Sequence, residues 1–233
     1  MLALYIGNKN YSTWSLRPWL VLTVFGIEFK EHWLKFDDFK SNSPFKQQAM
    51  ALHPTGKVPL LQDGNLVIAD SLAICEYLAE RFPEKHLWPA DRDARARARS
   101  ICAEMHSGFS SIRNLCPMNI EADLSEIGLE LWESNAHLNT DVQRIQMIWS
   151  ERPVQGGFLC GEQFSIADAF YAPIILRMVG FGLPIDEANQ DYVQRVLAVP
   201  ALKQWVQQAC MEHCFVEIDE PYRQDASTHR MQW

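Results

Sequence analysis

Residues 57–78 read KVPLLQDGNLVIADSLAICEYL, and this stretch decides the fold. Proline has no donor N–H, so Pro59 belongs at the start, at an edge or at a bend of the strand predicted over 58–62. Asp63 and Gly64 supply a tight turn, and the apolar run 66–68 returns as a second short strand. The stretch therefore predicts a β-hairpin that leads directly into the next element.

That next element is predicted to be a helix that begins at Asp70 and Ser71, because Leu72, Cys75 and Leu78 recur behind them at helical spacing. Its first turn offers a carboxylate, a hydroxyl and free backbone N–H groups, and a helix start of this kind binds anions. Asp and Ser are also common helix caps for structural reasons alone. Both interpretations fit these two residues, and the rest of the chain favours the anion site.

The segments before the hairpin alternate between strand and helix patterns. Strands are predicted over 2–6 and 29–36, and a helix over 15–25 that ends at Gly26. Residues 37–55 are polar and irregular, with a short helix near 45–52. The resulting order β-α-β-α-β-β-α is typical of a thioredoxin-like domain, in which helices flank a mixed sheet.

Strand patterns nearly vanish after residue 90. Residues 82–91 hold two prolines and end the periodic pattern, so they are interpreted as a linker. Helices are predicted over 91–115, 121–149, 167–179, 189–197 and 201–213, and a loosely held polar tail after Pro221. The predicted organisation is a thioredoxin-like α/β domain over 1–82, a linker over 83–90 and an all-α domain over 91–233.

Composition excludes several functional classes for the 233-residue chain. A net charge of −8 argues against nucleic acid and against anionic membrane surfaces as partners. The apolar run 166–183 contains Asp168 and Arg177 and is too polar to span a membrane. The N-terminus shows no export signal, and the six cysteines form neither a CxxC pair nor a metal-binding set, so we expect a cytoplasmic protein without a bound metal.

A capping box is predicted at Ser165 and Asp168, just ahead of an apolar helix. The helix looks apolar nearly all round and is therefore expected to be buried. A buried helix start must satisfy its N–H groups within the protein. This pair is therefore interpreted as structural and not as catalytic.

The loop over 8–20, NKNYSTWSLRPWL, lies between the first predicted strand and helix. In a thioredoxin-like domain this loop carries the reactive group at the positive end of the helix. No cysteine precedes Cys75, so thiol–disulfide chemistry by an enzyme cysteine is not expected. The loop instead concentrates hydroxyls, which fit either helix capping or catalysis: Tyr11, Ser12, Thr13 and Ser15.

These three segments, taken in order along the chain, resemble the glutathione transferase superfamily over nearly the whole sequence. The proline–hairpin–Asp-Ser unit resembles its glutathione-binding domain, and the capping box resembles the N-capping motif of its helical domain. The hydroxyl loop is most similar to serine-type bacterial members, akin to the zeta and theta classes. It departs from the Ser-Ser-Cys run of the zeta class, which weakens the case for a maleylacetoacetate isomerase.

The resemblance implies a detoxifying transferase that activates glutathione, its co-substrate, for attack on a small hydrophobic electrophile. Ser12 would donate a hydrogen bond to the sulfur, with Tyr11 and Thr13 as alternative donors and glutathione contacts. The remaining implied glutathione contacts are His53, Lys57, Val58, Pro59 with a cis bond before it, Asp70 and Ser71. The implied electrophile site comprises Trp14, His106, Phe109 and Arg113. The resemblance also implies a homodimer, and no tightly bound cofactor.

Two alternatives stay open at this point. A glutathione-transferase-like protein can act without catalysis as a ligand-binding or regulatory module, although the hydroxyl loop and the Asp-Ser pair favour an enzyme. Within enzymes, a glutathione-dependent isomerase or dehalogenase uses the same thiolate. The sequence does not separate these reactions, because the electrophile site is the variable part.

Overall fold

The computed structural model describes residues 1–227, 231 and 233. A small mixed sheet with its helices comes first and a helical domain follows, which is the predicted fold class. In chain order the elements are β1 (Leu2–Ile6), α1 (Thr13–Val24), β2 (Phe29–Trp33), α2 (Pro44–Leu52), β3 (Leu60–Asp63), β4 (Leu66–Ile68), α3 (Ser71–Arg81), the 3-10 helix Pro83–Lys85, α4 (Arg92–Ser107), α5 (Ser110–Leu115), α6 (Ser125–Ser134), α7 (Ala136–Ser150), α8 (Ile166–Gly180), α9 (Glu187–Leu197), α10 (Pro200–Glu212) and the 3-10 helix Glu217–Asp219.

The sheet has the strand order β2-β1-β3-β4. β1 runs parallel to β2 and antiparallel to β3, so that Leu2 lies opposite Phe29 on one side and Asp63 on the other. β3 and β4 form the predicted hairpin, whose turn contains Gly64 at a φ of 59°, a conformation that glycine adopts readily. β3 begins one residue after Pro59, because proline cannot donate to the ladder.

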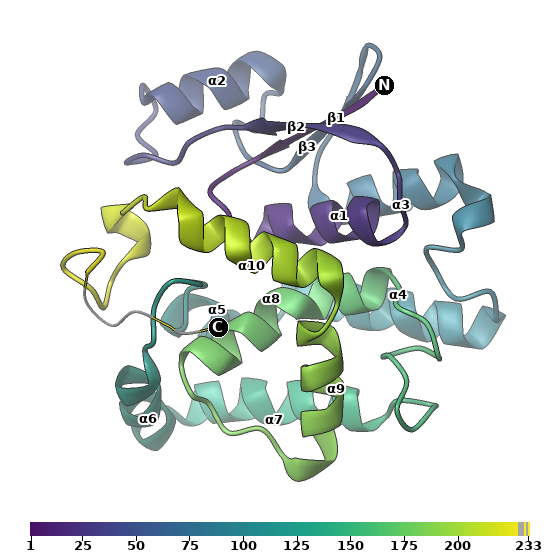
Figure 1. The fold of residues 1–233 in the computed structure, drawn as a ribbon, viewed down its shortest axis with the longest axis vertical. Coiled ribbons are helices and arrows are strands. Elements are labelled where there is room, and N and C mark those ends of the chain that lie inside the picture. Colours follow the sequence, from purple (N-terminus) through teal and green to yellow (C-terminus); the bar gives the residue numbers. More distant parts are fainter. Residues whose placement is uncertain (228–230, 232) are drawn as a thin grey trace.

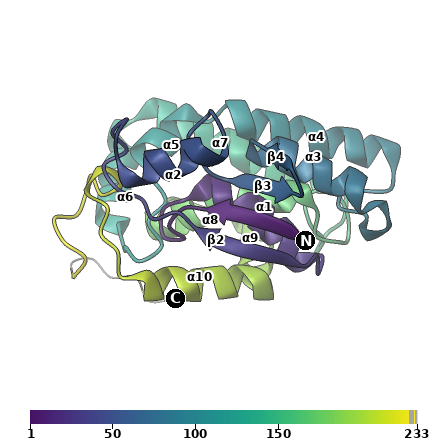
Figure 2. The same cartoon turned by 90° about the horizontal axis from the view of Figure 1, so that it is seen from above.

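The sheet is covered on both faces, as Figures 1 and 2 show. α2 covers one face, while α1 and α3 lie on the other, between the sheet and the helical domain. α1 contacts α3, α8 and α10, and its Leu16, Trp19 and Leu20 are almost wholly buried. The helix that follows the hydroxyl loop is therefore enclosed by both parts of the chain, which fixes the position of its first turn.

α8 is the predicted buried helix, and its start carries the predicted capping box. The Ser165 hydroxyl accepts from the Ala167 N–H at 3.3 Å, and the Asp168 carboxylate accepts from the Ser165 N–H at 2.9 Å. Asp168 also accepts from the Leu159 N–H and the Tyr192 hydroxyl. Burial raises the pKa of Asp168 to about 6, although these hydrogen bonds oppose the rise. None of the helices in the described part of the chain combines the length and apolar character that crossing a membrane requires.

Two helices that the sequence predicts as continuous are each broken once. The stretch 91–115 is divided into α4 and α5, because Gly108 caps α4 and Phe109 adopts a left-handed conformation at a φ of 56°. The stretch 121–149 becomes helical only at Ser125 and is divided into α6 and α7 at Asn135, whose side chain caps α7. Glycine favours helix ends and asparagine favours helix starts, so Gly108 and Asn135 were the signals in the sequence for these two breaks.

Part of the segment after Pro221 is held against the helical domain, and the prediction of a loosely held tail is wrong for Tyr222, Arg223 and Trp233, whereas residues 224, 225 and 227 are exposed. The Tyr222 hydroxyl donates to a carbonyl at the end of α5 at 2.8 Å. The side chain of Arg223 is fully buried beside Glu220, and the Trp233 indole donates to a carbonyl of the loop before α6. The rest of that predicted tail, residues 228–230 and 232, lies outside the described residues.

Candidate functional site

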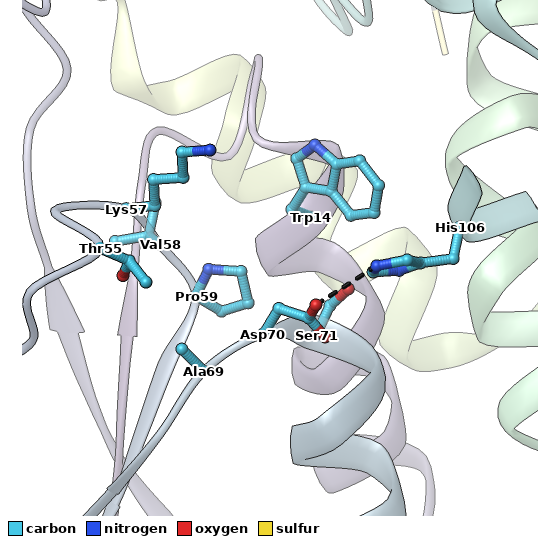
Figure 3. Close-up of a pocket in the computed structure, with 9 residues that line it drawn as sticks. All are labelled: Trp14, Thr55, Lys57, Val58, Pro59, Ala69, Asp70, Ser71 and His106. Atoms are coloured by element: carbon cyan, nitrogen blue, oxygen red, sulfur yellow. Dashed lines mark ion pairs between the residues drawn. The ribbon is translucent and has the colours of Figure 1, made fainter. Parts of the chain in front are cut away.

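A cavity of about 250 Å³ lies where the start of α1, the loop before β3, the start of α3 and the end of α4 meet. Figure 3 shows the side chains around it, which come from the sheet domain and from α4. All the lining residues except Thr55 and Ala69 are residues that the sequence analysis assigns to the site. The lining residues are Trp14, Thr55, Lys57, Val58, Pro59, Ala69, Asp70, Ser71 and His106.

The backbone at Val58 and Pro59 forms one wall of the cavity. The bond between these residues is cis, as predicted. The paired residues of β3 begin only after Pro59, so Val58 lies beyond the hydrogen-bond ladder that β3 makes with β1 and β4. An extended peptide ligand can therefore pair with this backbone as an added strand would.

The start of α3 provides the polar end of the cavity. The Asp70 carboxylate caps the helix, accepting from the backbone N–H groups of Leu72 at 2.9 Å and Ala73 at 3.2 Å. Ser71 is the first helical residue, and its hydroxyl is buried without a hydrogen-bond partner in the described part of the chain. Because an unpaired buried hydroxyl is costly, an anionic group that enters the cavity here supplies the missing partner.

His106 connects the helical domain to the start of α3. Its Nε2 lies 3.2 Å from Oδ2 of Asp70, the contact drawn as a dashed line in Figure 3. Its ring meets the Trp14 ring edge-on, with 5.2 Å between the centroids. Its Nδ1 is buried and has no partner among the described residues. α4 thus contributes a polar wall that faces the helix cap of the sheet domain.

Two arginines flank Trp14 without lining the cavity themselves. The guanidinium carbon of Arg17 lies 4.1 Å from the Trp14 ring centroid and 4.8 Å from that of Phe170. Arg17 is buried, and this burial lowers the pKa of its guanidinium to about 9. Arg113 lies 5.4 Å from the Trp14 ring and donates to the His106 carbonyl at 3.1 Å. Contacts with both cations hold the indole against the cavity.

Ser12 precedes Trp14 by two residues and is the N-cap of α1. Its side chain does not cap the helix, and its hydroxyl is instead hydrogen-bonded to the hydroxyl of Ser15 at 2.8 Å. Ser12 is 5% exposed and is not among the lining residues, although it adjoins them in the chain. Its hydroxyl is therefore engaged within the protein by a group that can exchange donor and acceptor roles.

The Tyr11 hydroxyl is bonded to the C-terminal segment, residues 214–223, and Tyr11 is not among the residues that line the cavity. The hydroxyl donates its single proton to Oε1 of Glu220 at 2.6 Å, and the carbonyl of Cys214 lies 2.9 Å away as an alternative acceptor. Burial, together with hydrogen bonding to Glu220 and its charge, raises the pKa of Tyr11 well above the usual range. A phenol held in this way by the C-terminal segment is a poor source of a proton for a ligand in the cavity.

The other predicted residues, Thr13, His53 and Phe109, are not among the residues that line the cavity. Thr13 is buried in the first turn of α1, and the His53 ring contacts the Thr55 hydroxyl at 3.0 Å. Phe109 is buried in the hydrophobic core at the break between α4 and α5. Thr55 and Ala69 line the cavity but were not predicted as site residues. The hydroxyl of Thr55, in the polar loop before the hairpin, was a signal for the site, whereas Ala69 has no polar side chain to indicate it.

Comparison with known proteins gives two matching family models and a related protein. The model described as "Glutathione S-transferase, N-terminal domain" matches residues 11–81, and "Glutathione S-transferase, C-terminal domain" matches residues 113–208. Glutathione S-transferase 1 of Dianthus caryophyllus is 31% identical over 186 residues, which are 79% of this chain and 80% of that protein.

Other similar proteins carry different names. Maleylacetoacetate isomerase of Pseudomonas aeruginosa is 26% identical, covering 75% of this chain and 81% of that protein. A stringent starvation protein A homolog of Pasteurella multocida is 26% identical, covering 65% and 66%. Among solved structures, a glutathione transferase homolog from Burkholderia with bound glutathione has a TM-score of 0.65 at 25% identity, covering 91% of this chain and 98% of that one.

Proposed function

The chain belongs to the glutathione S-transferase family, and we propose that it activates the glutathione thiol as a thiolate for attack on a small hydrophobic electrophile. The observation that carries the proposal is the buried hydroxyl of Ser71 at the cavity, which has no hydrogen-bond partner among the described residues. It lies at a helix N-terminus, beside a capping carboxylate, in a cavity whose wall also includes Val58 just before β3. A peptide with a terminal carboxylate and an amine matches these three features.

We assign the parts of glutathione by charge and by backbone geometry. The γ-glutamyl carboxylate pairs with the Ser71 hydroxyl and with the N-terminus of α3, while the amine pairs with Asp70. The cysteinyl unit pairs with the backbone of Val58, next to Pro59. The glycyl carboxylate pairs with Lys57, which lines the cavity, and His53 lies farther out as a secondary contact.

We assign thiol activation to Ser12. A free thiol has a pKa of about 8.5, so little of it is thiolate at neutral pH. Lowering that pKa by about two units requires roughly 2.7 kcal/mol of differential stabilisation. A hydrogen bond to the charged sulfur together with the N-terminus of α1 supplies energy of this order. The thiolate then attacks an electrophilic carbon in the adjoining part of the cavity.

We place the electrophile on the side of the cavity formed by Trp14 and His106, where an apolar ring and a polar ring face the thiol position. Arg113 supports this side through its contacts with Trp14 and the His106 backbone. Phe109 is part of the core at this point, so its role is to support the end of α4 and not to touch the substrate.

Several wider features complete the proposal. The chain divides into a glutathione-binding domain over 1–82, a linker over 83–90 and a helical domain over 91–233 that contributes the electrophile site. The protein acts in the cytoplasm as a homodimer, in which the first domain of one subunit faces the helical domain of the other. Light scattering at micromolar concentration measures the dimer, and a monomer would contradict that part of the proposal.

A second candidate function is a glutathione-dependent isomerase, and the similarity to a maleylacetoacetate isomerase favours it. Isomerisation uses the same thiolate but regenerates glutathione, so it leaves the thiol concentration unchanged, whereas conjugation consumes the thiol. The non-catalytic alternative predicts glutathione binding without either reaction.

The test is binding followed by turnover. Titration calorimetry should show binding of glutathione and much weaker binding of cysteinylglycine, which lacks the γ-glutamyl group assigned to Ser71 and Asp70. A chlorinated nitroaromatic should then be conjugated with loss of free thiol. Binding without turnover would favour the non-catalytic module, and equal affinity for the two peptides would contradict the assignment of the site.

A further inference from the structure

The loop that precedes Ser12 is anchored by the C-terminal end of the chain. Glu220 is 5% exposed and accepts from the Tyr11 hydroxyl at 2.6 Å. Its other oxygen accepts from Nδ2 of Asn119 at 2.6 Å and from Nε of Arg223 at 2.9 Å. A buried carboxylate is thus surrounded by donors, and one of them belongs to the residue next to Ser12.

A second residue of the same loop is fixed in the same way. Asn10 donates its amide to Oδ1 of Asn119 at 2.9 Å and accepts from the Glu121 N–H at 2.8 Å. Asn119 also donates to Glu220, so both anchors belong to one buried network. The side chains of the two residues before Ser12 therefore find their partners in the helical domain and in the C-terminal segment.

This anchoring bears on the reaction because consecutive Cα atoms are only about 3.8 Å apart. The Ser12 N–H is bonded to the Asn8 carbonyl at 2.8 Å, and the Thr13 N–H to the Tyr11 carbonyl at 3.0 Å. A shift of Tyr11 is therefore transmitted directly to the Ser12 hydroxyl. Hydrogen bonding to a reacting atom is sensitive to displacements of this kind, since small errors in position slow reactions considerably.

We propose that Glu220 is a positioning residue for Ser12, acting through the Tyr11 hydroxyl. The C-terminal segment thereby sets the geometry of thiol activation although it does not line the cavity. The inference rests on the proposed role of Ser12 and extends it to a segment more than 200 residues away along the chain.

The test compares Tyr11→Phe and Glu220→Gln with the matched control Tyr222→Phe. Tyr11→Phe removes only the hydroxyl, and Glu220→Gln keeps the shape of the acceptor while removing its charge. Tyr222 lies in the same C-terminal segment and also donates its hydroxyl, but to the Leu115 carbonyl. Its loss removes a hydrogen bond to a neutral carbonyl in the same segment without touching the loop that carries Ser12.

The informative readout is the pH midpoint at which the thiol of bound glutathione ionises, followed by thiolate absorbance. We expect this midpoint to rise by about half to one pH unit in both test variants, because a displaced Ser12 stabilises the thiolate less. kcat measured at about pH 5.5, below the midpoints of wild type and variants, should fall about three- to tenfold in proportion, with little change in the KM for glutathione. Tyr222→Phe should leave both quantities at wild-type values.

A purely structural role gives a different pattern. If Tyr11→Phe and Glu220→Gln lower the unfolding midpoint but keep the wild-type thiol midpoint and kcat, the positioning proposal is wrong. In a Ser12→Ala background, adding Glu220→Gln should cause no further rise of the thiol midpoint, and a full additional rise would also overturn it. If Ser12→Ala alone changes nothing, the proposed role of Ser12 fails and this inference fails with it. If Ser12→Ala raises the thiol midpoint while Tyr11→Phe and Glu220→Gln do not, only this inference fails.

Discussion

The hydroxyls of Ser12 and Ser15 are hydrogen-bonded at 2.8 Å, and the Ser15 oxygen also accepts from the Gly7 N–H at 3.2 Å. Ser15 is completely buried, so this pair links the end of β1 to the N-cap of α1. Because a hydroxyl proton rotates, Ser15 can donate to Ser12 while Ser12 donates to a ligand sulfur. This relay, in which Ser15 donates to Ser12 and Ser12 donates to the sulfur, would orient the Ser12 proton toward the cavity.

Ser15→Ala should therefore slow conjugation about three- to tenfold, less than the loss of Ser12 itself, because the donor remains but loses its orientation. The variant should also lose about 1–2 kcal/mol of folding stability, since the Gly7 N–H loses its acceptor. Steady-state kinetics and denaturant unfolding measure the two effects. Ser107→Ala is the control, because that exposed hydroxyl donates to the Ala103 carbonyl of its own helix. Unchanged kcat in Ser15→Ala would contradict the relay.

Ser71→Ala should weaken glutathione binding about tenfold or more without lowering the stability of the free protein. The hydroxyl is assigned to a charged carboxylate, a bond worth about 1.5–3 kcal/mol, and without ligand it has no partner among the described residues. Calorimetric titration and thermal unfolding measure the two quantities. A variant that melts several degrees lower yet binds glutathione normally would show that Ser71 is only a structural cap.

Trp14→Ala should raise the KM for the electrophile about five- to tenfold while changing the KM for glutathione much less. The indole forms the cavity wall that faces His106, on the side assigned to the second substrate. Trp33→Ala is the control, because this tryptophan is 48% exposed at an edge strand and does not line the cavity. Equal increases in the KM values for both substrates would indicate that Trp14 contacts glutathione as well as the electrophile.

Asp168→Asn should alter the pH dependence of stability in a defined direction. The pKa of Asp168 is about 6 in the folded chain and about 3.9 when unfolded, so folding takes up a proton between these values. The free energy of unfolding of the wild type should therefore exceed that of the variant by the largest amount near pH 4. This difference should shrink as the pH rises to about 6, by at most about 1.4 kcal/mol per pH unit. Urea unfolding of both proteins at several pH values measures this difference. A difference that grows as the pH rises from 4 to 6 would contradict the raised pKa of Asp168.

Local signals in the sequence were sufficient for the parts of the site that neighbouring residues build. Pro59, the hairpin turn and the cap at Asp70 each act within a few residues, and their predicted structures are present. The break at Phe109 was missed because helical periodicity continues across it, and only Gly108 indicated an end. The pairing of Tyr11 with Glu220 could not be predicted, because it joins residues 209 positions apart through tertiary packing alone.

The central claim is that Ser12 stabilises the thiolate of bound glutathione, and the most direct test is the ionisation of that thiol. Thiolate absorbance of the saturated complex should titrate about two pH units below free glutathione in the wild type and return toward about 8.5 in Ser12→Ala. kcat near neutral pH should fall roughly ten- to a hundredfold, while Thr13→Ala, the neighbouring control, should retain the wild-type midpoint. An identical midpoint in the wild type and in Ser12→Ala would contradict the account.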